Sequence, residues 1–245
     1  MTQANIDKAR QETIAYHEEY YSKHKLFDKD SWLAAGDQEL LKLTDKLAEI
    51  YKANSSAPLM VLDLGAGVGR NCIPLAQALK AMAVKATIEA IDILPQSIDM
   101  LKENAVKYEV EDYIKASCQD NDALNLQPNK YDLVFAISVL EHCQGKDKVR
   151  EILDKMASAV RPGGYCQIEI TTDRKVTALD NGDEFATSVE TPLTKEEVKD
   201  LLDQAFSKFQ NERYTVFAYQ EEILREKRKA LWHSQQTSFI ARRKV

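Results

Sequence analysis

The segment VLDLGAGVGR, Val61–Arg70, places three glycines at alternate positions after an apolar run that leads into Asp63. A strand-to-helix turn built from small residues lets a ligand approach the backbone amides, and it typically binds a nucleotide-like molecule. A dinucleotide site has the spacing GxGxxG, whereas here the third glycine comes one residue early. We therefore expect a nucleotide-like ligand other than a dinucleotide at the turn formed by Gly65, Ala66, Gly67, Val68, Gly69 and Arg70.

The carboxylate of Asp63 indicates which ligand this turn accepts. A carboxylate aimed at a pyrophosphate repels it, whereas an ammonium group is attracted. A second acidic residue, Asp92, closes the next predicted strand, where a carboxylate can accept hydrogen bonds from both hydroxyls of a ribose. The two acids together predict a nucleoside that carries a cationic amino-acid tail.

Alternating strand and helix patterns position these residues. Near-continuous apolar runs separated by amphipathic helices predict a parallel sheet that is covered on both faces. We expect a doubly wound α/β fold. The predicted strands are residues 59–65, 87–92, 113–118, 131–138 and 164–171, and the helices between them are 71–82, 95–108 and 146–160.

The two ends of the chain depart from this alternation. Residues 1–57 contain helical patterns and are predicted to form an N-terminal cap or lid, and residues 58–245 the ligand-binding domain. Near the C-terminus we expect a helix at 196–206 and strands at 214–219 and 237–243. These late strands pair antiparallel if no helix separates them, although residues 221–232 could form one.

This combination resembles the class I S-adenosylmethionine-dependent methyltransferases over about residues 59–171. The resemblance is carried by the glycine turn, Asp92, the segments SCQDNDAL and YDLVFAISVLEH, and the RPGGY lead-in to the fifth strand. It implies a Rossmann-like, mostly parallel seven-stranded sheet with an antiparallel C-terminal strand and an N-terminal helical cap. It also implies that the cofactor is S-adenosyl-L-methionine.

The resemblance implies a role for each matching position. The glycine turn and Asp63 hold the methionine end of the cofactor, and Asp92 binds the ribose, with Ile93 against the adenine. Asp120 meets the adenine amino group with Asn121 beside it, although Asp122, two positions on, offers a carboxylate as well. The end of the fourth strand lies under the methionine and the reactive sulfonium, at Ile137, Ser138 and Val139.

The catalytic residues are the least legible part of the sequence. Methyl transfer from a sulfonium is an in-line displacement, in which the enzyme chiefly aligns and desolvates the reactants. A general base is needed only if the acceptor must lose a proton. We predict that His142 and Glu141, just past the fourth strand, contact the acceptor. The alternative is that Glu141 hydrogen-bonds the next helix and His142 only packs.

Two further segments are candidates for contact with ligands. His17, Tyr20, Tyr21 and His24 fall on neighbouring helical faces, where they form either an aromatic lid that favours a cation or a face that docks on the core. The insertion at residues 173–192 is expected to border the acceptor pocket.

Several reaction classes lack their signatures here. A magnesium-dependent enzyme needs carboxylates at the ends of the fourth and fifth strands. This chain offers Ser138 and residues 171–173 there, so we expect no metal. The Asn-Pro-Pro-Tyr signature for exocyclic base nitrogens is also absent. A small-molecule methyl acceptor follows by elimination. The segments GVGRN, RPGGY and SFIARRK are similar to the tellurite-resistance and thiopurine-like methyltransferases.

Three alternatives remain from the sequence. GAGVGR followed by SVLEH is similar to protein N-terminal amine methyltransferases, which carry Asp-Asn where this chain has Thr172-Asp173. A nicotinamide-dependent oxidoreductase would explain a glycine turn, but the early third glycine argues against it. A nucleoside-binding or partner-regulating protein without turnover is the third alternative.

Composition constrains partners and location. The formal net charge of −6 argues against nucleic acid as the main partner, despite basic residues near the C-terminus. The four cysteines are scattered without a CxxC pair, which is typical of reduced thiols rather than of a zinc site. The polar N-terminus shows no apolar signal region, and no run is long enough to span a bilayer. We therefore expect a cytoplasmic location.

Overall fold

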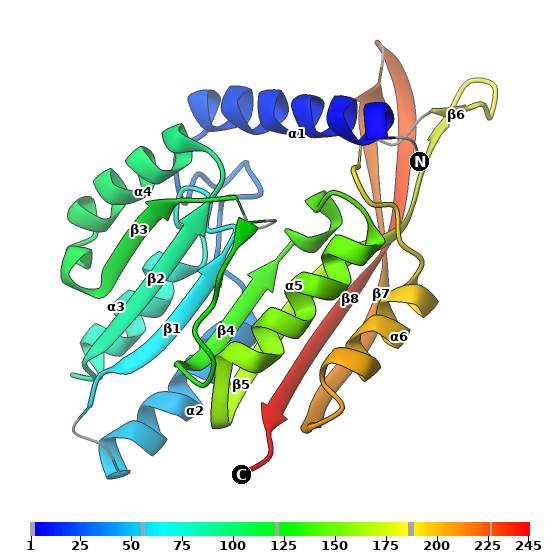
Figure 1. The fold of residues 1–245 in the computed structure, drawn as a ribbon. Helices are drawn as coiled ribbons and strands as arrows, with labels where there is room; N and C mark the ends of the chain where they lie inside the picture. Colours follow the sequence, from blue (N-terminus) through cyan, green and yellow to red (C-terminus); the bar gives the residue numbers. More distant parts are fainter. Residues whose placement is uncertain (1–2, 55–56, 121–122, 186–188, 226) are drawn as a thin grey trace.

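The computed structural model describes residues 3–54, 57–120, 123–185, 189–225 and 227–245. Its centre is a mixed sheet in the order β3-β2-β1-β4-β5-β8-β7, with the short strand β6 paired to β5 (Figure 1). The pairs β1–β2, β2–β3, β1–β4 and β4–β5 are parallel, and β8 runs antiparallel to both of its neighbours. The predicted doubly wound, mostly parallel sheet with an antiparallel C-terminal strand is confirmed.

The parallel half of the sheet closely follows the predicted strands. Leu59–Leu64 and Tyr131–Ile137 lie at its centre and are almost wholly buried, as near-continuous apolar runs in a doubly covered sheet must be. The strands are β1 (Leu59–Leu64), β2 (Ala86–Asp92), β3 (Ile114–Cys118), β4 (Tyr131–Ile137), β5 (Val160–Ala178), β6 (Glu184–Phe185), β7 (Phe209–Arg225) and β8 (Arg228–Arg243).

Helices cover both faces of the sheet because side chains alternate along each strand. On β1, Val61 packs with α2, α3 and α4, whereas Leu62 and Leu64 pack with α5 and α6 on the opposite face. The helices are α1 (Gln3–Lys23), α2 (Gln38–Asn54), α3 (Cys72–Ala81), α4 (Pro95–Lys107), α5 (Lys146–Ala159) and α6 (Lys195–Ala205), with short 3₁₀ turns η1 (Glu111–Tyr113) and η3 (Leu140–His142).

The C-terminal strands extend further than the sequence patterns predict. A helix over residues 221–232 was an alternative, but the described residues of this segment instead belong to a long β7–β8 hairpin in which Glu221 faces Trp232 and Arg225 faces Arg228. Strand β5 is 19 residues long, and it pairs with β8 on both sides of a register shift between Thr172 and Lys175. The extended hairpin therefore rises beyond the carboxyl ends of the parallel strands (Figure 1).

Helix α1 crosses above the carboxyl ends of the parallel strands, from α4 toward the β7–β8 hairpin (Figure 1). It is a polar helix, and among its described side chains few are buried, notably Ile6, Ala9 and Tyr21. Helix α2, by contrast, packs its apolar face into the core beside α3. Within the described part of the chain, every helix is too short or too polar to cross a membrane.

The central strand predicts where the fold is most sensitive. Leu62 is fully buried. We therefore expect Leu62→Ala to lower the free energy of unfolding by about 2–5 kcal/mol through lost burial and a residual cavity.

Val106, on the outer face of α4, provides the control because it is 62% exposed. Val106→Ala should change the free energy of unfolding by less than about 0.5 kcal/mol, as surface substitutions usually do. Urea denaturation followed by circular dichroism measures both variants, and equal effects would contradict the assigned core.

Candidate functional site

A cavity of about 1150 Å³ lies between α1 and the carboxyl ends of the parallel strands. Its lining includes Gly67 of the glycine turn and Asp92 after β2, and it also includes Arg174 of β5 and Trp232 in the turn half of the β7–β8 hairpin. Its volume exceeds the range of about 300–1,000 Å³ that is usual for ligand pockets. The space therefore suffices for a nucleoside-sized ligand together with a second molecule.

The glycine turn requires glycine at two positions for different reasons. Gly65 has φ +72°, and a Cβ there would overlap the side chain of Val139 at the end of β4. Gly67 has φ +52°, and a Cβ there would lie 2.7 Å from the phenol oxygen of Tyr21 on α1. The turn thus lets β4 and the lid helix approach its backbone closely.

Asp63 lies buried beneath this turn with an unsatisfied oxygen. The residue is 2% exposed and its side chain hydrogen-bonds with Cys72, while Oδ2 has no hydrogen-bond partner. Burial raises the pKa of Asp63 to about 8. A buried carboxylate without a counter-charge is costly, so an ammonium group bound in the turn would relieve that cost. The residues here fit the amino-acid tail predicted from the sequence.

Asp92 joins the glycine turn to the end of β2. Its carboxylate accepts hydrogen bonds from the backbone N–H groups of Gly67 at 2.8 Å and Leu94 at 2.9 Å. Burial raises the pKa of Asp92, and these amides act in the opposite direction. Because each carboxylate oxygen has a further lone pair, Asp92 retains the capacity to accept hydrogen bonds from a ribose.

Asp120, in the loop after β3, is held by the lid. Arg10 of α1 donates a hydrogen bond from Nη2 to Asp120 Oδ2 at 2.5 Å. Asn121, predicted beside it, lies outside the described residues. The contact fastens α1 to the end of the cavity where the adenine was expected, so opening the lid would also change that end.

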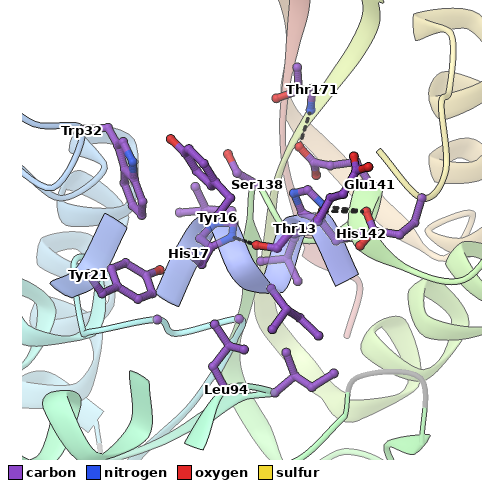
Figure 2. A pocket seen from close by; sticks show the side chains of 18 of the residues that line it. Thr13, Tyr16, His17, Tyr21, Trp32, Leu94, Ser138, Glu141, His142 and Thr171 are labelled. Carbon is purple, nitrogen blue, oxygen red and sulfur yellow. Dashed lines mark hydrogen bonds and ion pairs between the residues drawn. The ribbon is translucent and has the colours of Figure 1, made fainter. Parts of the chain in front are cut away.

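A histidine and a buried carboxylate form a pair in the cavity wall. His142 Nδ1 lies 2.9 Å from Glu190 Oε2, and Glu190 is 2% exposed (Figure 2). The Thr13 hydroxyl of α1 lies 3.4 Å from the same Glu190 oxygen. Because an ionised carboxylate only accepts hydrogen bonds, Glu190 places the proton of a neutral His142 on Nδ1. The Nε2 lone pair is then available to a ligand.

Glu141 is placed differently from His142. It is fully buried, and its Oε1 accepts a hydrogen bond from Arg174 Nη2 at 2.8 Å. The same oxygen accepts one from the Thr171 N–H at 3.3 Å (Figure 2). The Arg174 guanidinium in turn lies over the ring of Trp232 at 5.5 Å. Glu141 thus fixes the position of Arg174 at the cavity wall, and its contact with an acceptor stays a prediction.

The predicted aromatic lid divides into two groups. His17 and Tyr21 line the cavity together with Tyr16, whereas Tyr20 stacks on Trp32 at 5.0 Å and on His24 at 4.4 Å. The guanidinium of Arg70, at the end of the glycine turn, lies 5.5 Å from the centre of the Trp32 ring. This stack connects the C-terminal part of α1 to the cofactor turn.

The structure brings most of the predicted site residues around one cavity. Among the described ones, Asp63 and Gly69 lie behind its wall, and the roles assigned to individual residues stay predictions. The insertion at 173–192 does border the cavity, as expected. Five residues that line the cavity were not predicted from the sequence, because each lies in a segment without a recognisable motif. They are Arg10, Thr13, Trp32, Arg174 and Glu190.

Potential metal ligands give no positive indication. Among residues that the structure describes, no three His, Cys, Asp or Glu side chains are grouped so that they could hold a metal ion. The described cysteines are all free thiols, and Cys118 is the exposed one among them. A metal-independent reaction stays a prediction.

Known proteins similar to this chain include several methyltransferases. Residues 61–164 match a family model described as a methyltransferase domain. The chain is 32% identical over 111 residues to norajmaline N-methyltransferase of Rauvolfia serpentina, an alignment that covers 44% of this chain and 36% of that protein. It is 25% identical over 166 residues to ubiquinone biosynthesis O-methyltransferase of Coxiella burnetii, covering 67% and 62% of the two chains.

Solved structures share the fold. TehB from Haemophilus influenzae superposes with a TM-score of 0.57 at 20% identity, over 83% of this chain and 62% of that one. The chain spans less than two thirds of the length of either curated relative. The match to a methyltransferase domain favours the methyltransferase over the nicotinamide-dependent alternative.

Two glycines with nearly the same φ separate crowding at the turn from backbone strain. Gly65→Ala strains φ +72° and overlaps Val139, whereas Gly182→Ala strains φ +76° in open space. We expect Gly65→Ala to weaken binding of S-adenosylhomocysteine more than tenfold and Gly182→Ala to leave it within twofold. Isothermal titration calorimetry measures both affinities, and equal losses would show that crowding at the turn is not decisive.

The raised pKa of Asp63 predicts a pH-dependent affinity. Below about pH 8 the carboxyl is largely protonated in the free protein, so binding an ammonium requires it to lose a proton. The affinity for S-adenosylhomocysteine should therefore rise about tenfold per pH unit between about pH 6 and 7.5. Asp63→Asn should bind more weakly with a flatter profile. If calorimetry gave the same pH dependence of the affinity for the unaltered protein and for Asp63→Asn, the prediction that Asp63 binds the ammonium group would be wrong.

The same raised pKa of Asp63 determines how the free energy of unfolding depends on pH. The folded state retains a proton that the unfolded state releases above about pH 4. Asp63 therefore stabilises the fold at low pH, and this contribution decreases as the pH rises to about 8.

Proposed function

We propose that the chain is a class I S-adenosylmethionine-dependent methyltransferase that methylates a small-molecule acceptor, a proposal supported by the match of residues 61–164 to a methyltransferase domain. The transfer is a direct, metal-independent in-line displacement. The observation that carries this proposal is the cavity under α1 that joins the glycine turn to the His142–Glu190 pair.

The cavity supports a small acceptor because it is roofed. Helix α1 lies across it and is held there by hydrogen bonds from Arg10 to Asp120 and from Thr13 to Glu190. A folded protein substrate would have to displace this helix, whereas a small molecule fits beneath it. The names of the two curated relatives, a norajmaline and a ubiquinone biosynthesis methyltransferase, support the same class of acceptor.

Each group at the site has a task in this proposal. S-adenosylmethionine, when bound, supplies an electrophilic methyl group on a positively charged sulfur. Asp63 and the glycine turn hold its ammonium end, Asp92 its ribose and Asp120 its adenine. Helix α1 excludes water, which strengthens the alignment of the reactants.

His142 acts as the general base when the acceptor carries a proton that must leave. Its Nε2 lone pair takes the proton, and the imidazolium that forms is stabilised by the buried carboxylate of Glu190 at 2.9 Å. Glu141 keeps Arg174 in place at the wall beyond this pair. The reaction needs no covalent intermediate.

A panel of amines, phenols, thiols and carboxylic acids with labelled S-adenosylmethionine tests the function. We expect methylation of at least one class, and His142→Gln should lower kcat by about 10²–10⁴-fold, as loss of a general base does, while S-adenosylhomocysteine affinity stays within twofold. His233→Gln, outside the cavity lining, is the matched control. Absence of turnover with the whole panel would favour the nucleoside-binding alternative.

A further inference from the structure

Helix α1 places a second imidazole beside His142. The rings of His17 and His142 are 6.1 Å apart between centres and meet edge to face, and both line the cavity (Figure 2). One comes from the lid and the other from the loop after β4. The position of α1 over the cavity therefore brings the two imidazoles together.

The hydrogen bonds of the two rings fix the same tautomer. His17 Nδ1 lies 2.9 Å from the backbone carbonyl oxygen of Thr13, and a carbonyl has no proton to give. Nδ1 of His17 therefore carries the proton, as Nδ1 of His142 does toward Glu190. Burial lowers the pKa of His17, with the neighbouring His142 acting in the same direction, so this ring is neutral at pH 7. In its neutral form, each ring then offers an unprotonated Nε2.

Unprotonated Nε2 atoms on two neighbouring rings would discriminate between classes of acceptor. A phenol, a thiol or a carboxylic acid has one proton at the reacting atom, and after losing it to His142 offers lone pairs only. The second imidazole would then face another acceptor without a hydrogen bond, which is costly in a closed site. An amine that has lost one proton still has N–H groups that can donate to His17.

The surroundings of His17 also favour a cation. Its ring centre lies 5.3 Å from that of Tyr16, 5.7 Å from that of Tyr21 and 6.1 Å from that of Trp32. Aromatic faces attract ammonium groups. The negative charges of Asp92 and Glu190 also favour a positive charge near this ring, because both act to raise the pKa of His17. Two arginines of the cavity wall are already paired with carboxylates, Arg10 with Asp120 and Arg174 with Glu141.

We propose that His17 and His142 together select an amine as the methyl acceptor, with His142 as the base and His17 as a positioning residue that accepts a hydrogen bond from a remaining N–H. This inference rests on the proposed function. The ammonium form of the amine gives one proton to His142 Nε2. The nitrogen lone pair forms the new N–C bond while the S–C bond breaks and its electrons stay on sulfur. The proton on His142 then passes to solvent.

The tautomers can be measured without any turnover. The chain has four histidines, so long-range ¹H–¹⁵N spectra of the imidazoles can be assigned with single His variants. At pH 7.5 we expect the Nδ1–H tautomer for His17 and His142, and the usual Nε2–H tautomer for His233. An Nε2–H tautomer at either cavity histidine would overturn the proposal.

Matched probes test the selectivity in the same spectra. With S-adenosylhomocysteine bound, phenethylamine should shift the Nε2 resonances of both cavity histidines, and 2-phenylethanol, 2-phenylethanethiol and phenylacetate should not. Failure of the amine to shift them, or equal shifts with all four probes, contradicts an amine site. The proposed function fails separately, if S-adenosylhomocysteine itself does not bind.

Turnover provides a third readout. His17→Phe keeps an aromatic ring without the acceptor nitrogen and should lower kcat/KM for amines by tenfold to a hundredfold, whereas His17→Gln, which keeps an acceptor oxygen, should recover part of that loss. His233→Phe should leave it within twofold. Methylation confined to phenols, thiols or acids would overturn the inference and leave the proposed function standing.

Discussion

The glycine turn is built over a carboxyl group that the fold buries with one oxygen lacking a hydrogen-bond partner. Asp63 ends up beneath the glycine turn because it alternates along β1 with Leu62 and Leu64, which must face the other side of the sheet. The packing of the central strand therefore sets the position of Asp63. Its unpartnered oxygen would favour a hydrogen-bond donor or a positive charge in a ligand bound at the turn. The same turn is approached from two further directions, by Val139 after β4 and by Tyr21 of α1.

The lid is bound to the domain chiefly through groups that face ligands. Arg10 and Thr13 hydrogen-bond Asp120 and Glu190, whereas Tyr21 approaches the glycine turn and also packs in the hydrophobic core. Few of its described side chains are buried, so little hydrophobic burial holds it closed. The contacts that hold α1 in place thus involve the same residues that line the cavity, and the helix also brings His17 to His142.

The predictability of each part of the structure follows from how local its cause is. The strands and helices of residues 59–171 were legible because apolar periodicity and the glycine turn are local signals. The β7–β8 hairpin was not, because residues 221–232 are rich in helix-favouring Glu, Lys and Arg. Cross-strand pairing with β5 and across the hairpin overrides that preference. Likewise, Asp92 could be inferred from its place at a strand end, whereas Glu190 sits in an insertion without periodicity and gains its meaning only from the fold.

The chain holds two tryptophans, and both line the cavity. Trp32 lies in the stack between Tyr20 and Arg70 beside the glycine turn, while Trp232 carries the guanidinium of Arg174. A ligand bound beside the glycine turn would change the surroundings of Trp32, and one that contacts Arg174 would change those of Trp232. Variants that keep only one of the two indoles would therefore let binding on each side be followed by intrinsic fluorescence without a label.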